Sequence, residues 1–404
     1  MRAFRTLSPW VLSSTLLLAS CGGSDPDVPG SGSPSGAPTT AGNFTAVVSF
    51  GDSLSDVGSY APAASLAGDG SAPYFGGRFT TNDTTTGAPT ATPLGKVWVE
   101  NLAASLGLIV TPAEVGFGGT SVQCPAAAAP ALASTCTAYG QGGARVTDPN
   151  GIGKSLGALT VPLVTQVANH LTRFGSFKNS DLILVYGGSN DALIQFDVFA
   201  AAAARIQAGA AAGLISPDRA NLELFSAQQV AQEAMKTAAL ELATLVKTQI
   251  LAKGGTYVAV MTLSDIADTP FGNLPEVVPA RAVLSALSET FNLWLREGLT
   301  GQPVQFIDTW ALYKETYANP AKYGIVNNTG VACDLAKIRA ITGGAVDDGS
   351  SLFCNATPGA PYNTIVTGAD VNTWQFADSV HPTTAGHKAI GEAFAAQLHA
   401  FGWI

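Results

Sequence analysis

Apolar residues fall into two alternating kinds of run along most of the chain. Short, continuous apolar runs typical of buried strands cover residues 45–50, 181–186, 256–263 and 304–308. Longer stretches with helical spacing or Ala-rich composition cover residues 97–106, 161–174, 196–213, 217–253, 280–299 and 384–401. Strands that alternate with helices predict an α/β fold, a three-layer α/β/α sandwich with a doubly wound central parallel sheet.

The segments between these runs are expected to be mostly loops. Residues 54–92, 116–136 and 323–361 are rich in turn-forming or small residues, and 116–136 looks like an inserted loop. Residues 108–110 are expected to form a short strand, and residues 196–253 a helical insertion whose role stays open. No internal repeat or second domain boundary is visible, so residues 43–404 are expected to form one domain.

The N-terminal residues 1–20 have the pattern of a lipoprotein signal peptide. Two arginines precede an apolar stretch that is too short to span a bilayer. Leu18-Ala19-Ser20-Cys21 resembles a bacterial lipobox, in which cleavage leaves Cys21 as a lipidated N-terminus. The alternative is a plain secretory signal, but small residues before a cysteine without an evident partner favour the lipoprotein. Residues 21–42 are then a flexible Gly/Ser/Pro tether.

This leader sets the expected location. Gly22 follows the cysteine, which resembles outer-membrane sorting in Gram-negative bacteria. We therefore expect a lipid-anchored protein of the cell envelope at the outer membrane, with a periplasmic or secreted protein as the alternative.

Composition narrows the possible partners. Hydrophobic residues make up 47% of the chain, so a large core can form. The formal net charge of −9 disfavours nucleic acid, or an anionic membrane surface, as a partner. Membrane association is thus expected only through the lipid anchor, and the oligomeric state is open.

Four cysteines remain once Cys21 is set aside, and they form two local pairs. In an exported protein these predict two disulfides, Cys124–Cys136 and Cys333–Cys354. A metal site is the alternative, but Cys-x-x-Cys spacing and a nearby histidine are both missing, so no metal is expected.

One serine stands where a nucleophile would be exposed. The apolar run 45–50 stops at Gly51, which permits a sharp turn at the end of a strand. Ser53 then lies at the rim of the sheet, with its hydroxyl and its own N–H facing the same space. From these residues alone, an ordinary turn with a capping serine is equally compatible.

A base for this serine is found among four histidines. His170, His387 and His399 fall on expected helices and read as structural, whereas His381 lies in a polar loop, three residues after Asp378. The Asp378 carboxylate can reach His381 Nδ1 and fix its tautomer, which leaves Nε2 to accept the proton of Ser53.

Three blocks carry a resemblance to a known family. Phe50-Gly51-Asp52-Ser53-Leu54-Ser55-Asp56, Gly188-Ser189-Asn190-Asp191 and the final Asp378-to-His381 block resemble, in this order, those of the GDSL or SGNH hydrolases. The resemblance runs from about residue 43 to the C-terminus. It implies a flavodoxin-like fold, a catalytic triad of Ser53, Asp378 and His381, and no cofactor.

The family also implies an oxyanion hole. Its donors would be the Ser53 N–H, the Asn190 side-chain amide and the Gly143 N–H, since residues 138–146 resemble the family's second block. Gly119 is a rival for the third position, and Asn190 by itself would also suit a turn. Gly77-Arg78-Phe79 resembles the family's segment beside the active site.

The expected function is cleavage of carboxylic esters, as an esterase or lipase, through an acyl-enzyme intermediate. The substrate is expected to be a small-molecule or lipid ester, with acyl chain length and alcohol undetermined. Carbohydrate O-deacetylase, phospholipase and thioesterase activities use the same triad in this family. A catalytically silent surface binding module is the alternative from another class, but intact Ser53, Asn190, Asp378 and His381 argue against it.

Overall fold

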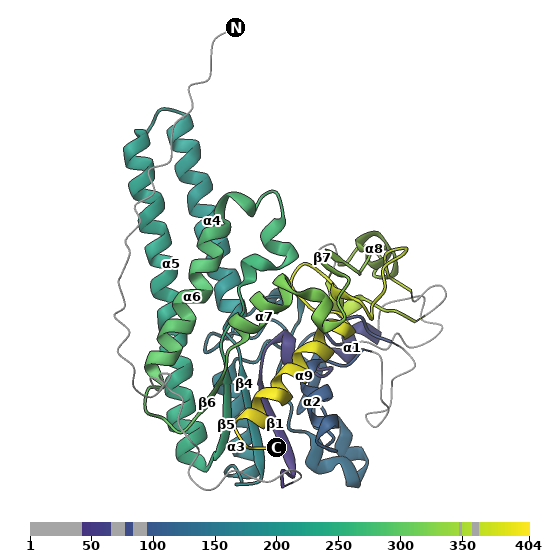
Figure 1. Ribbon diagram of the computed structural model, residues 1–404. Helices are drawn as coiled ribbons and strands as arrows, with labels where there is room; N and C mark the ends of the chain where they lie inside the picture. Colours follow the sequence, from purple (N-terminus) through teal and green to yellow (C-terminus); the bar gives the residue numbers. More distant parts are fainter. Residues whose placement is uncertain (1–42, 66–76, 84–94, 347–349, 358–362) are drawn as a thin grey trace.

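The structure is a computed structural model that describes residues 43–65, 77–83, 95–346, 350–357 and 363–404 (Figure 1). The expected signal peptide, Cys21 and the tether lie outside the described residues. The centre is a parallel sheet in the order β1-β4-β5-β6. Its strands are β1 (Ala46–Gly51), β4 (Asp181–Tyr186), β5 (Tyr257–Met261) and β6 (Gln305–Ile307). These strands coincide with the four apolar runs.

A further extended segment lies along the outer edge of β1. The Ser49 N–H donates to the Thr137 carbonyl at 3.0 Å, and the Tyr139 N–H donates to the Ser49 carbonyl at 2.8 Å. Residues 137–139 therefore occupy the place of a fifth parallel strand, on the side of β1 opposite β4. If the segment 137–139 is counted as the second strand in chain order, then β1, β4, β5 and β6 are strands 1, 3, 4 and 5. The spatial order is then 2-1-3-4-5, which is the flavodoxin-like order that the family resemblance implies.

Helices flank the sheet on both faces (Figure 1). On one face α2 (Trp98–Ser105) packs against α9 (Thr384–Ala400). On the other lie α3 (Leu163–Phe174), α5 (Pro217–Leu245) and α6 (Arg281–Gly298), with α5 packed against both α3 and α6. The buried Trp98 ring joins the first face to the sheet, because it contacts both Tyr186 of β4 and Phe394 of α9.

The winding of the chain determines where a site can form. The chain passes from β1 through α2 to residues 137–139, and then through α3 to β4, so the connections on the two sides of β1 cover opposite faces. In open α/β sheets, ligands bind at the carboxyl ends of the strands where the winding reverses. Here that crevice lies between the ends of β1 and β4.

The end of β1 needs glycine. Gly51 pairs with Tyr186, and a Cβ at position 51 would lie 2.4 Å from the Tyr186 carbonyl oxygen. A side chain there would force β1 away from β4, so the close strand approach beside Ser53 depends on Gly51.

The helical insertion extends beyond the sheet as a hairpin (Figure 1). Helix α4 (Ser189–Ala211) begins directly after β4, seven residues earlier than expected, and packs along α5. The Ser216 hydroxyl accepts the Arg219 N–H, and Pro217 occupies the first turn of α5, where a missing N–H costs nothing. Among the described helices, none has the length and apolar character needed to cross a bilayer.

Four expectations for the segments between the main strands and helices were wrong. Residues 108–110 form no strand. The expected loop 116–136 instead completes an antiparallel hairpin of β2 (Glu114–Phe117) and β3 (Thr120–Gln123), followed by two 3-10 turns. The segment 323–361 contains β7 (Asn327–Val331), which pairs with β8 (Trp374–Phe376), and α8 (Leu335–Ile341). These elements bury few apolar residues, so hydrophobic periodicity could not reveal them. The expected loop 54–92 contains the short helix α1 (Ala61–Ser65). Helix α7 (Thr309–Ala318) follows β6, where no element was expected.

The structure contains both expected disulfides. Cys124 is bonded to Cys136 and Cys333 to Cys354, with Cα–Cα separations of 5.4 and 5.7 Å. Each links segments that have little hydrophobic core of their own: the β2–β3 hairpin with its 3-10 turns, and the region around β7 and α8.

Candidate active site

Ser53 lies in a tight turn directly after β1. It opens a 3-10 turn, Ser53–Ser55, which is capped by Asp52: the carboxylate accepts the Leu54 N–H at 3.1 Å. From α3, the Gln166 side chain donates to the Gly51 carbonyl at 2.8 Å and accepts the Gly51 N–H at 2.9 Å. This paired contact fixes the backbone two residues before the serine. Sequence reasoning missed Gln166, because a polar residue on a helix carries no sign of a partner 115 residues away.

Asp378 and His381 come from the loop after β8, at the far end of the chain. The distance between His381 Nε2 and Ser53 Oγ is 2.8 Å. On the other side of the ring, His381 Nδ1 lies 2.8 Å from Asp378 Oδ2 and 2.9 Å from Oδ1. With the Nδ1 proton donated to the carboxylate, Nε2 is the acceptor for the serine hydroxyl. The structure thus brings together all three residues expected to form the triad.

The Asp378 carboxylate is buried but heavily hydrogen-bonded. It accepts the N–H groups of Val380 at 3.0 Å, His381 at 2.7 Å and Ser351 at 2.7 Å. Burial alone raises the pKa of Asp378, but the facing His381 ring and these donors outweigh it and hold the pKa well below its ordinary value. The group is therefore a carboxylate at neutral pH and can stabilise a positive charge on His381.

Asn190 lies in the first turn of α4, at the end of β4. Its Nδ2 donates to the Ala144 carbonyl at 2.9 Å, which fixes the amide and leaves its second hydrogen for a ligand. This bond also places Asn190 next to the segment that contains Gly143. Within the described parts of the chain, neither the Ser53 N–H nor the Gly143 N–H has a protein acceptor. Both are available to bind an oxyanion.

The two candidate glycines differ sharply in their surroundings. Gly143 has a φ of +76°, and a Cβ there would lie 2.0 Å from the Ile152 carbonyl oxygen. Gly119 sits in the exposed two-residue turn between β2 and β3, where a Cβ would meet nothing within 4 Å. The structure therefore places Gly143, one residue from the carbonyl that binds Asn190, beside the other candidate donors.

Two buried aspartates hold the Gly143 segment from either side. Asp56 accepts the Gly142 N–H at 3.0 Å, as well as three donors from Gly58 and Ser59. Burial raises the pKa of Asp56 to about 6, although these hydrogen bonds oppose the shift. Asp191, beside Asn190, binds Arg145 Nε at 2.9 Å and the Val146 N–H at 3.1 Å. Both aspartates stand in the quoted sequence blocks, but nothing in their spacing predicted these contacts.

Phe79 covers one side of the site. Its ring centroid lies 4.9 Å from that of His381. A Cβ at position 142 would meet the same ring at 2.2 Å, so glycine is required there. The expected segment 77–79 thus does lie beside the triad, where Phe79 fills the space between the base and the Gly143 segment.

The other histidines do not reach Ser53. Both ring nitrogens of His387 are hydrogen-bonded, to the Trp98 N–H and the Phe79 carbonyl, and burial lowers its pKa to about 3. His170 is buried in an aromatic cluster with Phe177 stacked on it, and burial lowers its pKa to about 4. His399 lies on α9 and contacts the carbonyl of Ile404. Across the described segments, no cluster of three or more His, Cys, Asp or Glu is arranged as a metal site would need.

Comparison with known families agrees with this geometry. The family model of the GDSL-like lipases and acylhydrolases matches residues 47–394. The chain belongs to this family. No curated protein matches it at a significant level. The family match includes Ser53, Gly143, Asn190, Asp378 and His381, and it makes the protein a hydrolase of the general esterase or lipase type.

Proposed function

We propose that the protein cleaves carboxylic esters through an acyl-enzyme intermediate on Ser53. The observation that carries the proposal is the continuous hydrogen-bonded chain from Ser53 Oγ through His381 to Asp378, with distances of 2.8 Å on both sides of the ring. A serine hydroxyl becomes a competent nucleophile when a neutral imidazole accepts its proton in this way.

The proposed reaction has two halves. Ser53 Oγ attacks the ester carbonyl while His381 Nε2 takes the hydroxyl proton, and the carbonyl oxygen becomes an oxyanion. His381 returns the proton to the alkoxide as the C–O bond breaks, which releases the alcohol and leaves the acyl group on Ser53. Water then attacks the acyl-enzyme with His381 again as base, and collapse releases the acid and restores Ser53.

Charge stabilisation would come from two places. The ionised Asp378 faces the imidazolium that forms in each half-reaction. The oxyanion would be held by the N–H groups of Ser53 and Gly143 and by the Asn190 amide. Such fixed donors strengthen as charge develops, so they lower the barrier rather than only binding substrate.

Labelling and hydrolysis together test this proposal. The wild-type protein should react with a fluorophosphonate probe at Ser53 and hydrolyse p-nitrophenyl esters, whereas Ser53→Ala should do neither. A folded wild-type protein that binds an ester but neither hydrolyses it nor takes up the probe would instead favour a silent binding module.

The substrate class is a finer part of the proposal. We place small-molecule or lipid carboxylic esters first, and O-acetylated carbohydrates, phospholipids and thioesters are the alternatives on the same triad. Rates measured on p-nitrophenyl esters of increasing chain length, beside acetylated glycans, phospholipids and thioesters, should rank carboxylic esters highest. A higher kcat/KM on acetylated glycans would reassign the protein as a deacetylase.

We also propose that the protein is exported and anchored through a lipid on Cys21, at the outer membrane. The two disulfides support export, because such bonds persist in oxidising compartments. The wild-type protein should fractionate with membranes and Cys21→Ala should not. A processed, membrane-bound Cys21→Ala would contradict the anchor.

A further inference from the structure

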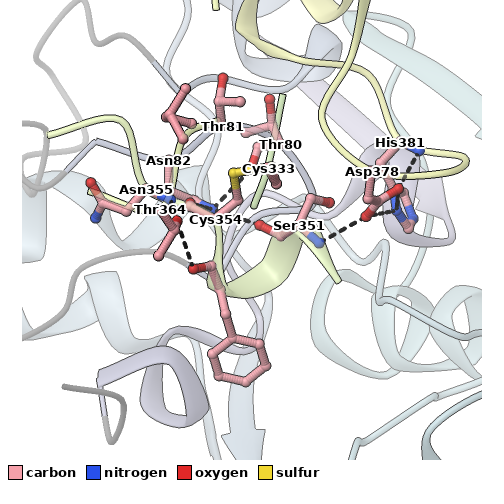
Figure 2. Close-up of a disulfide and its surroundings, with 12 residues drawn as sticks. Thr80, Thr81, Asn82, Cys333, Ser351, Cys354, Asn355, Thr364, Asp378 and His381 are labelled. Carbon is pink, nitrogen blue, oxygen red and sulfur yellow. Dashed lines mark hydrogen bonds and ion pairs between the residues drawn. A yellow bond between two sulfur atoms is a disulfide. The ribbon is translucent and has the colours of Figure 1, made fainter. Parts of the chain in front are cut away.

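The triad aspartate receives one hydrogen bond from a distant loop. The Ser351 N–H donates to Asp378 Oδ2 at 2.7 Å, to the same oxygen that lies 2.8 Å from His381 Nδ1 (Figure 2). Ser351 is fully buried and opens the 3-10 turn Ser351–Phe353, which is capped by the Ser350 hydroxyl. The carboxylate is thus clamped between its own loop and this turn.

The Cys333–Cys354 disulfide ties that turn to the strand region that carries Asp378. Cys354 directly follows the turn, and its partner Cys333 donates its N–H to the carbonyl of Ala377, the residue before Asp378, at 2.9 Å. The donor turn and the acceptor are therefore joined by one covalent link and one backbone hydrogen bond. Both cysteines are buried, so the link is part of the packed interior.

The same turn also holds the segment that covers the base. The Asn82 side chain donates to the carbonyls of Ser351 at 3.2 Å and Cys354 at 3.1 Å, and the Asn82 N–H donates to Cys354 at 3.0 Å. Asn82 lies three residues after Phe79, whose ring contacts His381. The disulfide-linked turn therefore supports the Asp–His pair at two points, directly through Ser351 (Figure 2) and indirectly through Asn82 and Phe79.

We propose that the Cys333–Cys354 disulfide is a positioning element of the active site, which acts through the Ser351 N–H to hold Asp378 against His381. The inference rests on the proposed esterase function and deepens it. Without the bond, the turn gains conformational freedom, the carboxylate loses a fixed donor, and the imidazole is less often aligned with Ser53. A small misplacement of a catalytic group can cost up to about a hundredfold in rate.

The second disulfide is a matched control. Cys124–Cys136 closes a loop of similar kind, and Arg173 on α3 contacts the Cys124 sulfur at 3.0 Å. The two sulfurs contact the Thr111 hydroxyl, the Ala133 carbonyl and the Arg173 guanidinium, and among the described residues neither cysteine is bonded to Asp378 or Ser53. Its removal tests what the loss of a disulfide does where no bond to Asp378 is affected.

The first experiment compares the two disulfides in the full-length protein. Cys333→Ala/Cys354→Ala should lower kcat for a p-nitrophenyl ester by about tenfold or more, with KM changed by less than about twofold. Cys124→Ala/Cys136→Ala should lower Tm but keep kcat within about twofold of wild type. Equal kcat in the two variants, whether both normal or both reduced, would overturn the inference. Inactive wild-type protein would instead refute the proposed function.

The second experiment keeps the disulfide and replaces the donor, so it tests the Ser351 step even if the cysteine variant fails to fold. Ser351→Pro has no N–H, stands at the first position of its turn, and follows a residue with φ −48° and ψ 126°, which suits a residue before proline. Ser351→Ala keeps the N–H and is the control. Proline should lower kcat by about tenfold or more and alanine by less than about twofold.

If Ser351 only stabilised the fold, the effect of Ser351→Pro on kcat would not depend on the presence of Asp378. In an Asp378→Ala background, Ser351→Pro should lower the remaining kcat by less than about twofold, because the group through which it acts is gone. If Ser351→Pro keeps the wild-type kcat, or costs as much without Asp378 as with it, the inference is wrong.

Discussion

The two halves of the active site are held in place by different means. Ser53 and Asn190 follow β1 and β4, whose paired residues are buried almost throughout, and the register pairs the last residues of the two strands, Gly51 and Tyr186. Asp378 and His381 follow β8, which belongs to a separate two-stranded sheet with β7. That half is held by loops, hydrogen bonds and a disulfide rather than by the central sheet.

The electrostatics of the halves differ as well. Around the nucleophile, burial raises the pKa of both Asp52 and Asp56 to about 6. In the other half, the facing histidine and the donors to Asp378 overcome burial and lower its pKa. In the sheet half, the buried carboxylates of Asp52 and Asp56 bind backbone N–H groups although burial disfavours their charge. In the loop half, the ionised Asp378 is the counter-charge to a positive His381.

This difference indicates how sensitive catalysis is to the loss of a single contact in each half. The sheet half is redundant, since Gly51 is bound by β4, by Gln166 and by the Gln141 N–H. The loop half is held by bonds from several separate loops, among them the bond from the Ser351 N–H to Asp378 and the bond from the Phe271 N–H to the Ser379 carbonyl at 2.8 Å. Small changes in the loop half should thus reach the chemistry more readily.

The largest effect is expected when one catalytic group is removed from either half. Ser53→Ala and His381→Ala should each lower kcat for ester hydrolysis by about 10⁴-fold or more, because proton transfer and attack are a single event. The double variant should be scarcely worse than either single one. Steady-state kinetics on variants with wild-type circular dichroism measure this.

Additive losses in the double variant would show that the two residues do not act as a unit. Substantial activity in His381→Ala, with loss in His170→Ala, His387→Ala or His399→Ala, would move the base elsewhere.

A smaller loss is expected at the oxyanion donors of the sheet half. Asn190→Ala should lower kcat by about 10²- to 10³-fold with a smaller change in KM, because the amide would bind charge that develops only in the transition state. Fluorophosphonate labelling should slow in parallel, since the phosphonate oxygen occupies the same site. An unchanged kcat would reduce Asn190 to a residue that holds the Ala144 carbonyl.

The sequence predicted the triad because each member stands in a local sequence pattern that can be recognised. A strand ends at Gly51 before Ser53, and Asp378 stands three residues before His381. It did not predict Gln166 or the Ser351 donor, which act across 115 and 27 residues. Single side-chain amides and backbone N–H groups leave no chemical pattern in a sequence.

The central strands of the fold could also be predicted from the sequence, whereas β7 and the start of α4 could not. The four central strands are buried apolar runs, but β7 has the sequence Asn-Asn-Thr-Gly-Val, in which only one residue is apolar. The start of α4 was missed because Asn190 and Asp191 place polar, site-facing side chains in its first turn, where an amphipathic pattern should begin. The contacts that Asn190 and Asp191 make at the site, rather than their helix propensity, account for these residue types in the first turn of α4.

The pH dependence of stability should separate the halves. Asp56 has a pKa of about 6 in the fold against an ordinary value of 3.8, so the folded protein binds the proton more tightly. The free energy of unfolding should then fall as pH rises from about 4 to about 6, by on the order of 3 kcal/mol for this group. Asp56→Asn cannot ionise, so urea titrations across this range should show a shallower decline than in wild type.

Asp378 has the opposite sign. Its lowered pKa gives a stabilisation that is complete above about pH 4 and is lost as pH falls below it. Wild type and Asp378→Asn should differ most near neutral pH and converge in acid. Parallel curves for wild type and both variants would contradict the contrast between the halves.

The smallest effect is expected at the glycine outside the site. Gly119 has a φ of +85° in an exposed turn, so Gly119→Ala should cost only about 1 kcal/mol of stability and leave kcat unchanged. Gly143→Ala has the same backbone strain, but its Cβ would also collide with the Ile152 carbonyl oxygen and displace the N–H beside Asn190. We expect kcat to fall at least about tenfold in Gly143→Ala. Ester kinetics and thermal melts of the two variants measure the contrast, and a loss of kcat in Gly119→Ala with none in Gly143→Ala would assign the third oxyanion donor to the turn between β2 and β3.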